Sequence, residues 1–405
     1  MAEPSTGILN DSERSEAADL LRPFFPHLSS LDELLARVPA EQSFAVRQDG
    51  RLAAVILWRR ETLLAYDRPV PIAIAGPGAT APEFQGRGLL AANMAAFLAS
   101  LRDSGCAVSG LETPVVRWHR GNGWEICSAV ARHHGDAARF RPASGPADGS
   151  LDARPPIEAL QELYRRAAAR RFGPLCRTGR QWAELLASQP GLGRRSHAAW
   201  REPDGTYGGY IITTRRPDCR GAIRLTVEEL ITVTPNAFLG LLRYLAEHDA
   251  EAWVQWDAPQ DDPLVHVVRD PHAITTSICT DKLLRVIDLA ALTMPAPDDD
   301  AAARADGLTL MVDDPLAPWN AGTWRVARTM PTTQAMVRAP QPPDGKLRGA
   351  WCSVPATVLG PLLSRFLSVE AAAEAGLIRA SCERALRQLR AFVGTGPAPY
   401  CPGAW

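Results

Sequence analysis

The residues best suited to chemistry form a glycine-rich turn, Gln85-Gly86-Arg87-Gly88, between an expected strand over 72–81 and an expected helix. The helix has an apolar face at helical spacing, made by Leu90, Met94, Phe97, Leu98 and Leu101. A turn of this kind exposes several backbone N–H groups at the start of a helix, and such a site binds phosphate without a metal. A tight turn with no ligand is the alternative.

The turn resembles the Q/R-x-x-G-x-G/A signature of the GCN5-related N-acetyltransferases (GNAT), which hold the pyrophosphate of coenzyme A (CoA) there. One position departs from it, because Leu90 replaces the last small residue. The resemblance implies that backbone N–H groups of residues 85–90, with the Arg87 cation, bind the pyrophosphate, and that 79–81 pair with the pantetheine arm. The cofactor residues expected are Ala79, Thr80, Ala81, Gln85, Gly86, Arg87, Gly88, Leu89 and Leu90.

Composition excludes several classes of protein. The formal net charge of the 405 residues is −1, and no basic block is present, so we expect no nucleic-acid partner. No apolar run is long enough to cross a bilayer, and the N-terminus lacks a signal-peptide pattern, so we expect a cytoplasmic protein without a membrane partner. The eight cysteines are scattered singly, which predicts neither a metal site nor a disulfide framework.

Turn-forming residues divide the chain at 141–156 and 294–307. We therefore expect a first domain over 1–140, a connector over 141–156, a second domain over 157–293 and a third over 294–405. Helices are expected at 30–38, 157–172, 235–249, 355–366, 369–375 and 381–392. Strands are expected at 43–47, 52–58, 107–112, 207–215, 222–233, 308–312 and 323–328.

The second domain repeats the order of strand and helix without the phosphate-binding turn. Thr234 is expected to cap the helix and Pro235 to occupy its first position. The connecting sequence Thr-Pro-Asn-Ala has no glycine, and Pro235 lacks the N–H that a phosphate needs. This domain is therefore expected to have the acyltransferase shape without the cofactor cradle.

The whole chain resembles the enhanced intracellular survival (Eis) type of acetyltransferase. The similar stretches are 82–90, Gly123-Trp124 after Glu112, 229–235, 270–273, 281–290, 318–324 and 399–405. The resemblance implies an α/β (α+β) fold of two tandem GNAT-type domains followed by a sterol-carrier-like (SCP2-like) α+β domain. It also implies acetyl transfer from acetyl-CoA, without a metal, to amines of small molecules such as aminoglycosides, and a homo-hexamer.

Some of the family's catalytic residues have a clear counterpart in this sequence, and others do not. The family uses a C-terminal carboxylate on an aromatic residue as general base, which here is Trp405. Trp124 stands where the family has a Tyr that protonates the departing thiolate, and an indole cannot release a proton at a useful pH. His119 is a substitute acid, or else a surface residue. Glu112 is a candidate for base or amine recognition, or else forms a cap or salt bridge, and Tyr400 could supply the missing phenol.

Two functions follow from these residues. The first is an acetyl-CoA-dependent N-acetyltransferase acting on a small amine, either a drug or an intermediate of specialised metabolism. The second is a protein of the Eis fold with altered chemistry, either another acyl or non-acyl enzyme or a ligand-binding protein. The intact Gln85–Gly88 turn favours the first function, and Trp124 favours the second.

Overall fold

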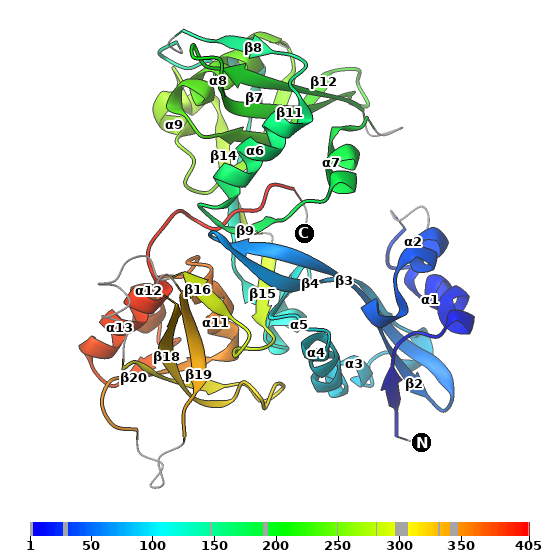
Figure 1. The fold of residues 1–405 in the computed structure, drawn as a ribbon. Coiled ribbons are helices and arrows are strands. Elements are labelled where there is room, and N and C mark those ends of the chain that lie inside the picture. The colour runs from blue at the N-terminus through cyan, green and yellow to red at the C-terminus, as the bar shows by residue number, and fades with distance from the viewer. Residues whose placement is uncertain are drawn as a thin grey trace.

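The computed structural model describes residues 3–26, 31–145, 148–188, 193–248, 250–280, 282–295, 307–330, 333–340, 347–403 and 405. Their strands form three mixed sheets, and helices pack against each of them (Figure 1). Most of the predicted break at 294–307 lies outside the described residues. Across the part of the chain that is described, no helix is both long and apolar enough to cross a membrane.

The first sheet contains the predicted phosphate-binding turn. Its strand order is β1 (Ser5–Gly7), β2 (Ser43–Gln48), β3 (Arg51–Ala65), β4 (Arg68–Thr80), β5 (Val108–Glu112), β15 (Lys282–Val286) and β6 (Glu125–Ile126), with β9 (Phe172–Leu175) paired to β3. The helices of this region are α1 (Arg14–Leu21), α2 (Leu31–Arg37), α3 (Leu89–Ala92), α4 (Met94–Asp103) and α5 (Val116–Gly121). Asp49 and Gly50 both have positive φ, as a two-residue hairpin between β2 and β3 requires.

The predicted helix after the turn is divided in two at Asn93. The Asn93 side-chain amide donates to the Leu89 carbonyl over 2.9 Å and competes with the helix backbone there. The apolar face is otherwise as predicted, since Met94, Phe97, Leu98 and Leu101 are buried against the sheet.

The second sheet has the order β14 (Thr275–Thr280), β7 (Ala129–Asp136), β13 (Trp253–Pro259), β12 (Ile223–Thr232), β11 (Tyr207–Pro217), β10 (Arg194–Arg201) and β8 (Ser150–Asp152). Its helices are α6 (Ile157–Ala168), α7 (Gly179–Leu186), α8 (Pro235–His248) and α9 (Leu264–Val267). The pair β12–β13 is parallel, as is β4–β5 in the first sheet. Thr234 caps α8 as predicted, because its Oγ1 accepts the Ala237 N–H.

Three strands cross between the two sheets, so the sheets do not follow the predicted boundaries at 140 and 157. Strand β7, within 1–140, lies between β13 and β14 of the second sheet. Strands β9 and β15, within 157–293, belong to the first sheet. The predicted helix over 157–172 stops at Ala168 because Phe172 begins β9. Residues 150–152 of the predicted connector form β8.

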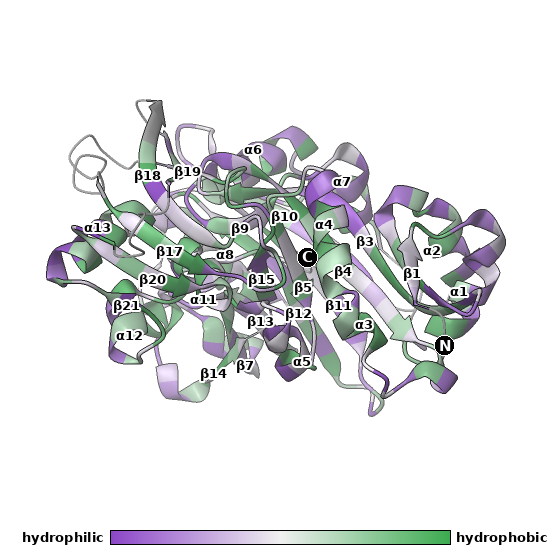
Figure 2. Cartoon of the chain, turned by 90° about the horizontal axis from the view of Figure 1, so that it is seen from below, coloured by the Kyte–Doolittle hydropathy of each residue, from purple (hydrophilic) through white to green (hydrophobic). Residues whose placement is uncertain are grey.

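The third sheet has the order β16 (Thr293–Pro295), β19 (Thr333–Arg338), β18 (Gly322–Met330), β17 (Thr309–Asp313), β20 (Trp351–Pro355) and β21 (Arg379–Ala380). Helices α11 (Ala356–Leu363), α12 (Val369–Glu374) and α13 (Glu383–Val393) pack on it. Helix α13 carries both hydrophilic and hydrophobic segments in Figure 2, and its buried side includes Leu389 and Phe392.

The largest apolar core joins the first and third sheets. Ile72 of β4 and Leu284 of β15 belong to the same buried cluster as Leu310 of β17 and Leu359 of α11. The cluster also includes Trp405. Burial of apolar area is the main favourable term in folding, so this shared core fixes the third domain against the first sheet and encloses the tail.

Candidate active site

The glycine-rich turn has the backbone conformation that an anion site needs. Gly86 and Gly88 have φ of 72° and 70°, values that favour glycine. Gly88 is also the N-cap of α3. Neither glycine has another atom near the position of a Cβ, and the turn is exposed. Among the described residues, the N–H groups of Gly86 and Gly88 have no backbone acceptor, so both can donate to a ligand.

The strand before the turn has an open edge. Strands β4 and β5 pair in parallel only at Ile72–Ile74, and β4 then continues to Thr80 against β3 alone. Ala79 and Thr80 pair with β3 through their other edge, as Ala79 with Val55 and Thr80 with Ala54. The separation of β4 from β5 therefore leaves a main-chain edge beside Ala79–Ala81, where the sequence predicted the pantetheine arm.

The C-terminal tail, which follows α13, ends near this opening. In Figure 1 it runs between the second sheet and the rest of the chain and ends beside β9. The Tyr400 N–H donates to the Phe172 carbonyl over 3.0 Å, and the Arg177 guanidinium donates to the Pro402 carbonyl over 3.4 Å. The tail is thus held along its length, and Trp405 at its tip is buried.

Trp405 fits against a glycine of β5. Its indole N–H donates to the Gly173 carbonyl over 3.1 Å. A Cβ at Gly110 would lie 2.4 Å from the Trp405 ring, so only glycine leaves room for that ring. Sequence reasoning missed this role of Gly110, since a single glycine in a strand does not reveal what approaches it.

Glu112, at the end of β5, binds the backbone of the same residue. Its Oε1 accepts the Trp405 N–H over 2.7 Å and lies 3.3 Å from Lys282 Nζ on the neighbouring strand β15. The main-chain carbonyl carbon of Trp405 is about 2.5 Å from that nitrogen by covalent geometry. Trp405, Glu112 and Lys282 therefore meet where β4 and β5 separate.

Lys282 was not predicted, although the sequence contained a signal for it. Only two lysines occur among 44 basic residues, and Lys282 is one of them. Its side chain is 4% exposed. A compact ammonium suits this buried position beside the Glu112 carboxylate better than a broad guanidinium, because it concentrates its charge on one nitrogen.

Trp124 lies in the core, which corrects the expectation that it lines the cleft. It is 1% exposed, and its indole N–H donates to Ser109 Oγ over 3.3 Å. The guanidinium of buried Arg285 lies 5.7 Å from its ring, and Gly123 leaves room for that guanidinium. Burial of this large apolar ring stabilises the core, which accounts for its position there.

Two of the candidate acids are poorly suited to donate a proton at neutral pH. Burial lowers the pKa of His119 to about 4, so its ring is neutral at pH 7. That ring stands edge-on to Trp118 and Trp124. The Tyr400 hydroxyl donates to the Asp257 carbonyl over 3.0 Å, and burial raises its pKa far above the ordinary value.

A charged cavity of about 380 Å³ lies on one side of the tail. Cys401–Gly403 form part of its wall, and its carboxylates come from Glu61, Glu184, Glu228 and Glu229. Each of these carboxylates also faces an arginine, the most buried pair being Arg177 with Glu229. This cavity is polar and open enough for a small amine near the tail.

At the equivalent place in the second sheet, a carboxylate occupies the start of α8. The Glu202 side chain accepts the Thr234 hydroxyl and the Asn236 side-chain amide, the latter over 2.6 Å. The position where a phosphate would approach the helix therefore already holds a negative charge. Among the described residues, no three His, Cys, Asp or Glu side chains gather as a metal site would require.

Comparison with known proteins agrees with this architecture. Residues 173–286 match the family model of a GNAT acetyltransferase domain, and residues 289–402 match that of a sterol carrier protein domain. No curated protein sequence matches the chain. The GNAT match falls largely on the second sheet, whereas the glycine-rich turn belongs to the first.

Solved structures share the fold over the full length. A GCN5-related N-acetyltransferase from Anabaena variabilis aligns over 100% of both chains with a TM-score of 0.81 and 17% identity. Eis1 from Mycobacterium abscessus aligns over 100% of both with a TM-score of 0.76 and 22% identity. A GCN5-related N-acetyltransferase from Kribbella flavida aligns over 100% of this chain and 98% of its own, with a TM-score of 0.78 and 18% identity.

The fold and the two domain matches define a GNAT acetyltransferase-type protein with a sterol carrier domain after it. The mixed α/β architecture and the two domain matches confirm the fold class predicted from the sequence. The chain shares its fold with Eis1, in agreement with the resemblance predicted from the sequence. The match to the GNAT acetyltransferase family model indicates an N-acyltransferase.

Proposed function

We propose that this protein is a cytoplasmic enzyme that transfers an acetyl group from acetyl-CoA to an amino group of a small molecule. The observation that carries the proposal is the convergence of three features on one opening of the first sheet. These are the exposed turn at Gly86 and Gly88, the free edge of β4, and the buried tip of the tail.

Each feature has a role in this proposal. The turn and Arg87 hold the pyrophosphate of acetyl-CoA, and the edge at Ala79–Ala81 pairs with its pantetheine arm. The α-carboxylate of Trp405 takes a proton from the substrate ammonium, while Glu112 and Lys282 position the tail. The resulting neutral amine attacks the carbonyl carbon of the thioester, and its nitrogen releases a second proton to solvent as the amide forms. The new C–N bond forms as the C–S bond breaks, and the leaving thiolate takes a proton from solvent, since Trp124, His119 and Tyr400 do not offer one.

The acceptor class follows from the family resemblance and the charged cavity. We propose a small polar polyamine, such as an aminoglycoside-like drug or an intermediate of specialised metabolism, that enters beside Cys401–Gly403. A second function remains on the same fold, because Trp124 stands in place of the tyrosine that serves as the family's acid. In that case the opening binds a ligand or serves a different transfer.

Thiol release tests the two functions against each other. The wild-type chain is incubated with acetyl-CoA and a panel of aminoglycosides and simple diamines, and free CoA is detected with a thiol reagent. Amine-dependent release supports the proposal. If calorimetry shows that acetyl-CoA binds but no amine in the panel releases thiol, the second function is preferred. If acetyl-CoA does not bind, the first function is excluded.

A second test concerns Trp405. A variant with a few residues added after Trp405 moves the α-carboxylate away and leaves the turn intact. We expect kcat to fall by about 10²–10⁴ with little change in the affinity for acetyl-CoA. An extended protein as active as the wild type would exclude this carboxylate as the base.

We also propose that the subunits form a homo-hexamer, as the family resemblance implies. Light scattering in dilute buffer provides the measurement. A particle with the mass of one 43.8 kDa chain would contradict this assembly.

A further inference from the structure

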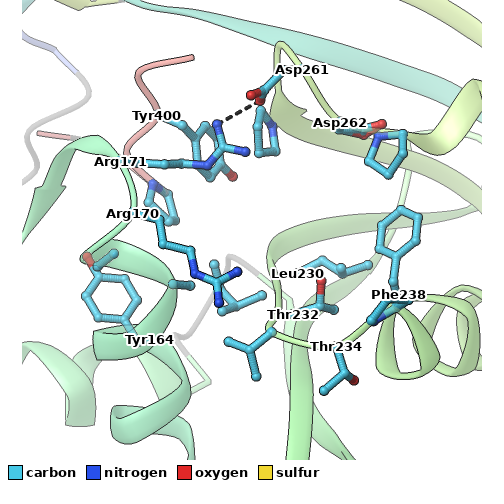
Figure 3. A pocket seen from close by; sticks show the side chains of 18 of the residues that line it. Tyr164, Arg170, Arg171, Leu230, Thr232, Thr234, Phe238, Asp261, Asp262 and Tyr400 are labelled. Carbon is cyan, nitrogen blue, oxygen red and sulfur yellow. Dashed lines mark hydrogen bonds and ion pairs between the residues drawn. The ribbon is translucent and has the colours of Figure 1, made fainter. Parts of the chain in front are cut away.

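A second cavity lies in the second sheet, at the place that corresponds to the opening between β4 and β5. Strands β12 and β13 pair in parallel only as far as Val227 and Trp256 and then separate. A cavity of about 540 Å³ occupies this separation, bounded by the end of β12, the start of α8, the end of α6 and the loop after β13 (Figure 3). We call it the β12–β13 cavity. Its volume is typical of a small-molecule site.

The walls of the β12–β13 cavity are mainly apolar. The apolar side chains come from both separated strands and from the two helices, and include Ala167, Ala168, Leu230, Phe238, Trp256 and Val267. Tyr400 and Pro402 of the tail also line it. An apolar enclosure of this size favours a ligand with a hydrocarbon body.

The cavity lacks a place for the diphosphate of CoA. Glu202 occupies the start of α8, and Pro235 has no N–H to offer there. A ligand of this cavity must therefore bind through another charged group.

The remaining charges identify that group. Arg171 pairs with Asp261 over 2.7 Å, and Asp261 also accepts the Ala398 N–H. Asp262 accepts the Leu264 N–H over 2.7 Å, and its other oxygen lies 3.3 Å from the His133 ring. These three charged side chains are thus already engaged by the protein.

Arg170 differs from them. Among the described residues, no ion pair or hydrogen bond of its guanidinium is found, and Figure 3 shows that group pointing into the cavity between Tyr164 and Thr232. A guanidinium offers two parallel N–H groups that match a carboxylate. The cavity therefore combines an apolar interior with an available cation.

We propose that the β12–β13 cavity binds a small organic carboxylate with an apolar chain, with the carboxylate on Arg170 and the chain against Leu230 and Phe238. The site is separate from the proposed acetyl-CoA site. Its occupant contacts the tail at Tyr400 and Pro402, a few residues from Trp405.

Calorimetry with decanoate tests the site on the full-length protein. We expect one decanoate per chain. Arg170→Glu reverses the charge at the cavity, and Ala167→Phe fills it, so we expect each to weaken binding at least tenfold, on the order of one charge-assisted hydrogen bond. Arg166→Glu, the same charge change on exposed α6 surface outside the cavity, should leave binding unchanged.

The charge preference is tested with decylammonium and 1-decanol, which we expect to bind more weakly than decanoate. Circular dichroism and Tm verify that each variant is folded. If Ala167→Phe does not fold, the result for Arg170→Glu alone decides the test. The proposal is overturned if the wild type does not bind decanoate, if decylammonium binds more tightly, or if Arg170→Glu behaves like Arg166→Glu. Binding of acetyl-CoA does not enter these results, so they are independent of the proposed function.

Discussion

Glu112 connects the tail to the first sheet through a single oxygen atom. Oε1 accepts the Trp405 N–H and pairs with the buried Lys282 ammonium. Replacing Glu112 with Ala removes both interactions, whereas Glu112→Gln keeps an acceptor for the N–H and loses the ion pair. We expect Glu112→Ala to lower the free energy of unfolding by about 1–3 kcal/mol and Glu112→Gln to cost less. Urea denaturation measures both.

A matched control for this prediction is Glu383→Ala on α13. Glu383 forms an i,i+4 pair with Arg387, and its side chain is 82% exposed, so its removal should cost less than about 0.5 kcal/mol. Equal costs at Glu112 and Glu383 would show that Glu112 does not hold the tail.

Because the His119 ring is partly buried, we expect the folded protein to lose stability in acid. Burial lowers the pKa of that ring from 6.5 to about 4, so the unfolded chain binds the proton more readily than the folded one between these values. The stabilisation is fully present above pH 6.5 and is lost as the pH falls towards 4. Because the ring is partly exposed, we expect a contribution of about 1–2 kcal/mol.

The measurement compares urea unfolding at pH 7.5 and pH 5 for the wild type and His119→Gln. The variant should lose less stability on acidification than the wild type, and His272→Gln, at an exposed position, should behave like the wild type. A wild-type loss identical to that of His119→Gln would show that this ring is not responsible.

Site residues with a distinctive backbone conformation or chemistry could be predicted from the sequence. Site residues whose roles depend only on packing could not. The glycines of the turn were recognisable because their spacing needs a special backbone. Lys282 and Gly110 were missed, since one is defined by its neighbour across strands and the other by the ring it admits. Trp124 was assigned to the cleft because it matches the position of the family's catalytic Tyr, and the sequence does not reveal the direction in which the indole points.

Among the elements, the glycine-rich turn offers the sharpest test of cofactor binding. Gly88 has φ +70°, so any side chain there is strained by about 1–2 kcal/mol, but no atom blocks a Cβ. Gly88→Glu adds a carboxylate where the pyrophosphate is proposed. We expect it to weaken CoA binding at least tenfold, measured by calorimetry, through repulsion between like charges.

Gly205→Glu is the control, because Gly205 also has positive φ and open space around its Cβ position, in an exposed turn of the second sheet. It carries the same backbone strain far from the turn and should bind CoA like the wild type. Titration of the wild type should give one CoA per chain. Two CoA molecules per chain, or undiminished binding by Gly88→Glu, would refute this assignment.

Elements with strong local signals were predictable, and elements defined by distant partners were not. The start of α8 was placed by Thr234 and Pro235, and the strands expected at 43–47 and 52–58 lie within β2 and β3. Short strands such as β9 have too few residues to show a period. Their pairing depends on segments more than a hundred residues away, which local patterns do not contain.

At the scale of the whole molecule, the crossing of strands makes the first two domains interdependent. A fragment of residues 157–293 lacks β7, an internal strand of the second sheet, and carries β9 and β15 without their partners. A fragment of residues 1–140 exposes β5 and β6 without β15 between them. Unpaired strand edges of this kind promote aggregation.

We therefore expect each fragment alone to be insoluble or unfolded by circular dichroism, and the intact chain to unfold without a separate transition for either domain. A fragment with residues 129–293 restores β7 and should be more soluble than 157–293. Independent folding of 1–140 and 157–293 would show that the exchanged strands are dispensable.

The late position of β15 also determines when the first sheet can be completed during translation. Strand β5 emerges from the ribosome about 170 residues before its neighbour β15, and domains otherwise tend to fold as they are synthesised. Until β15 follows, the nascent sheet keeps an open edge at β5, on the side of that strand away from β4. A chaperone that shields extended apolar strands is therefore expected to meet this protein during synthesis rather than after release.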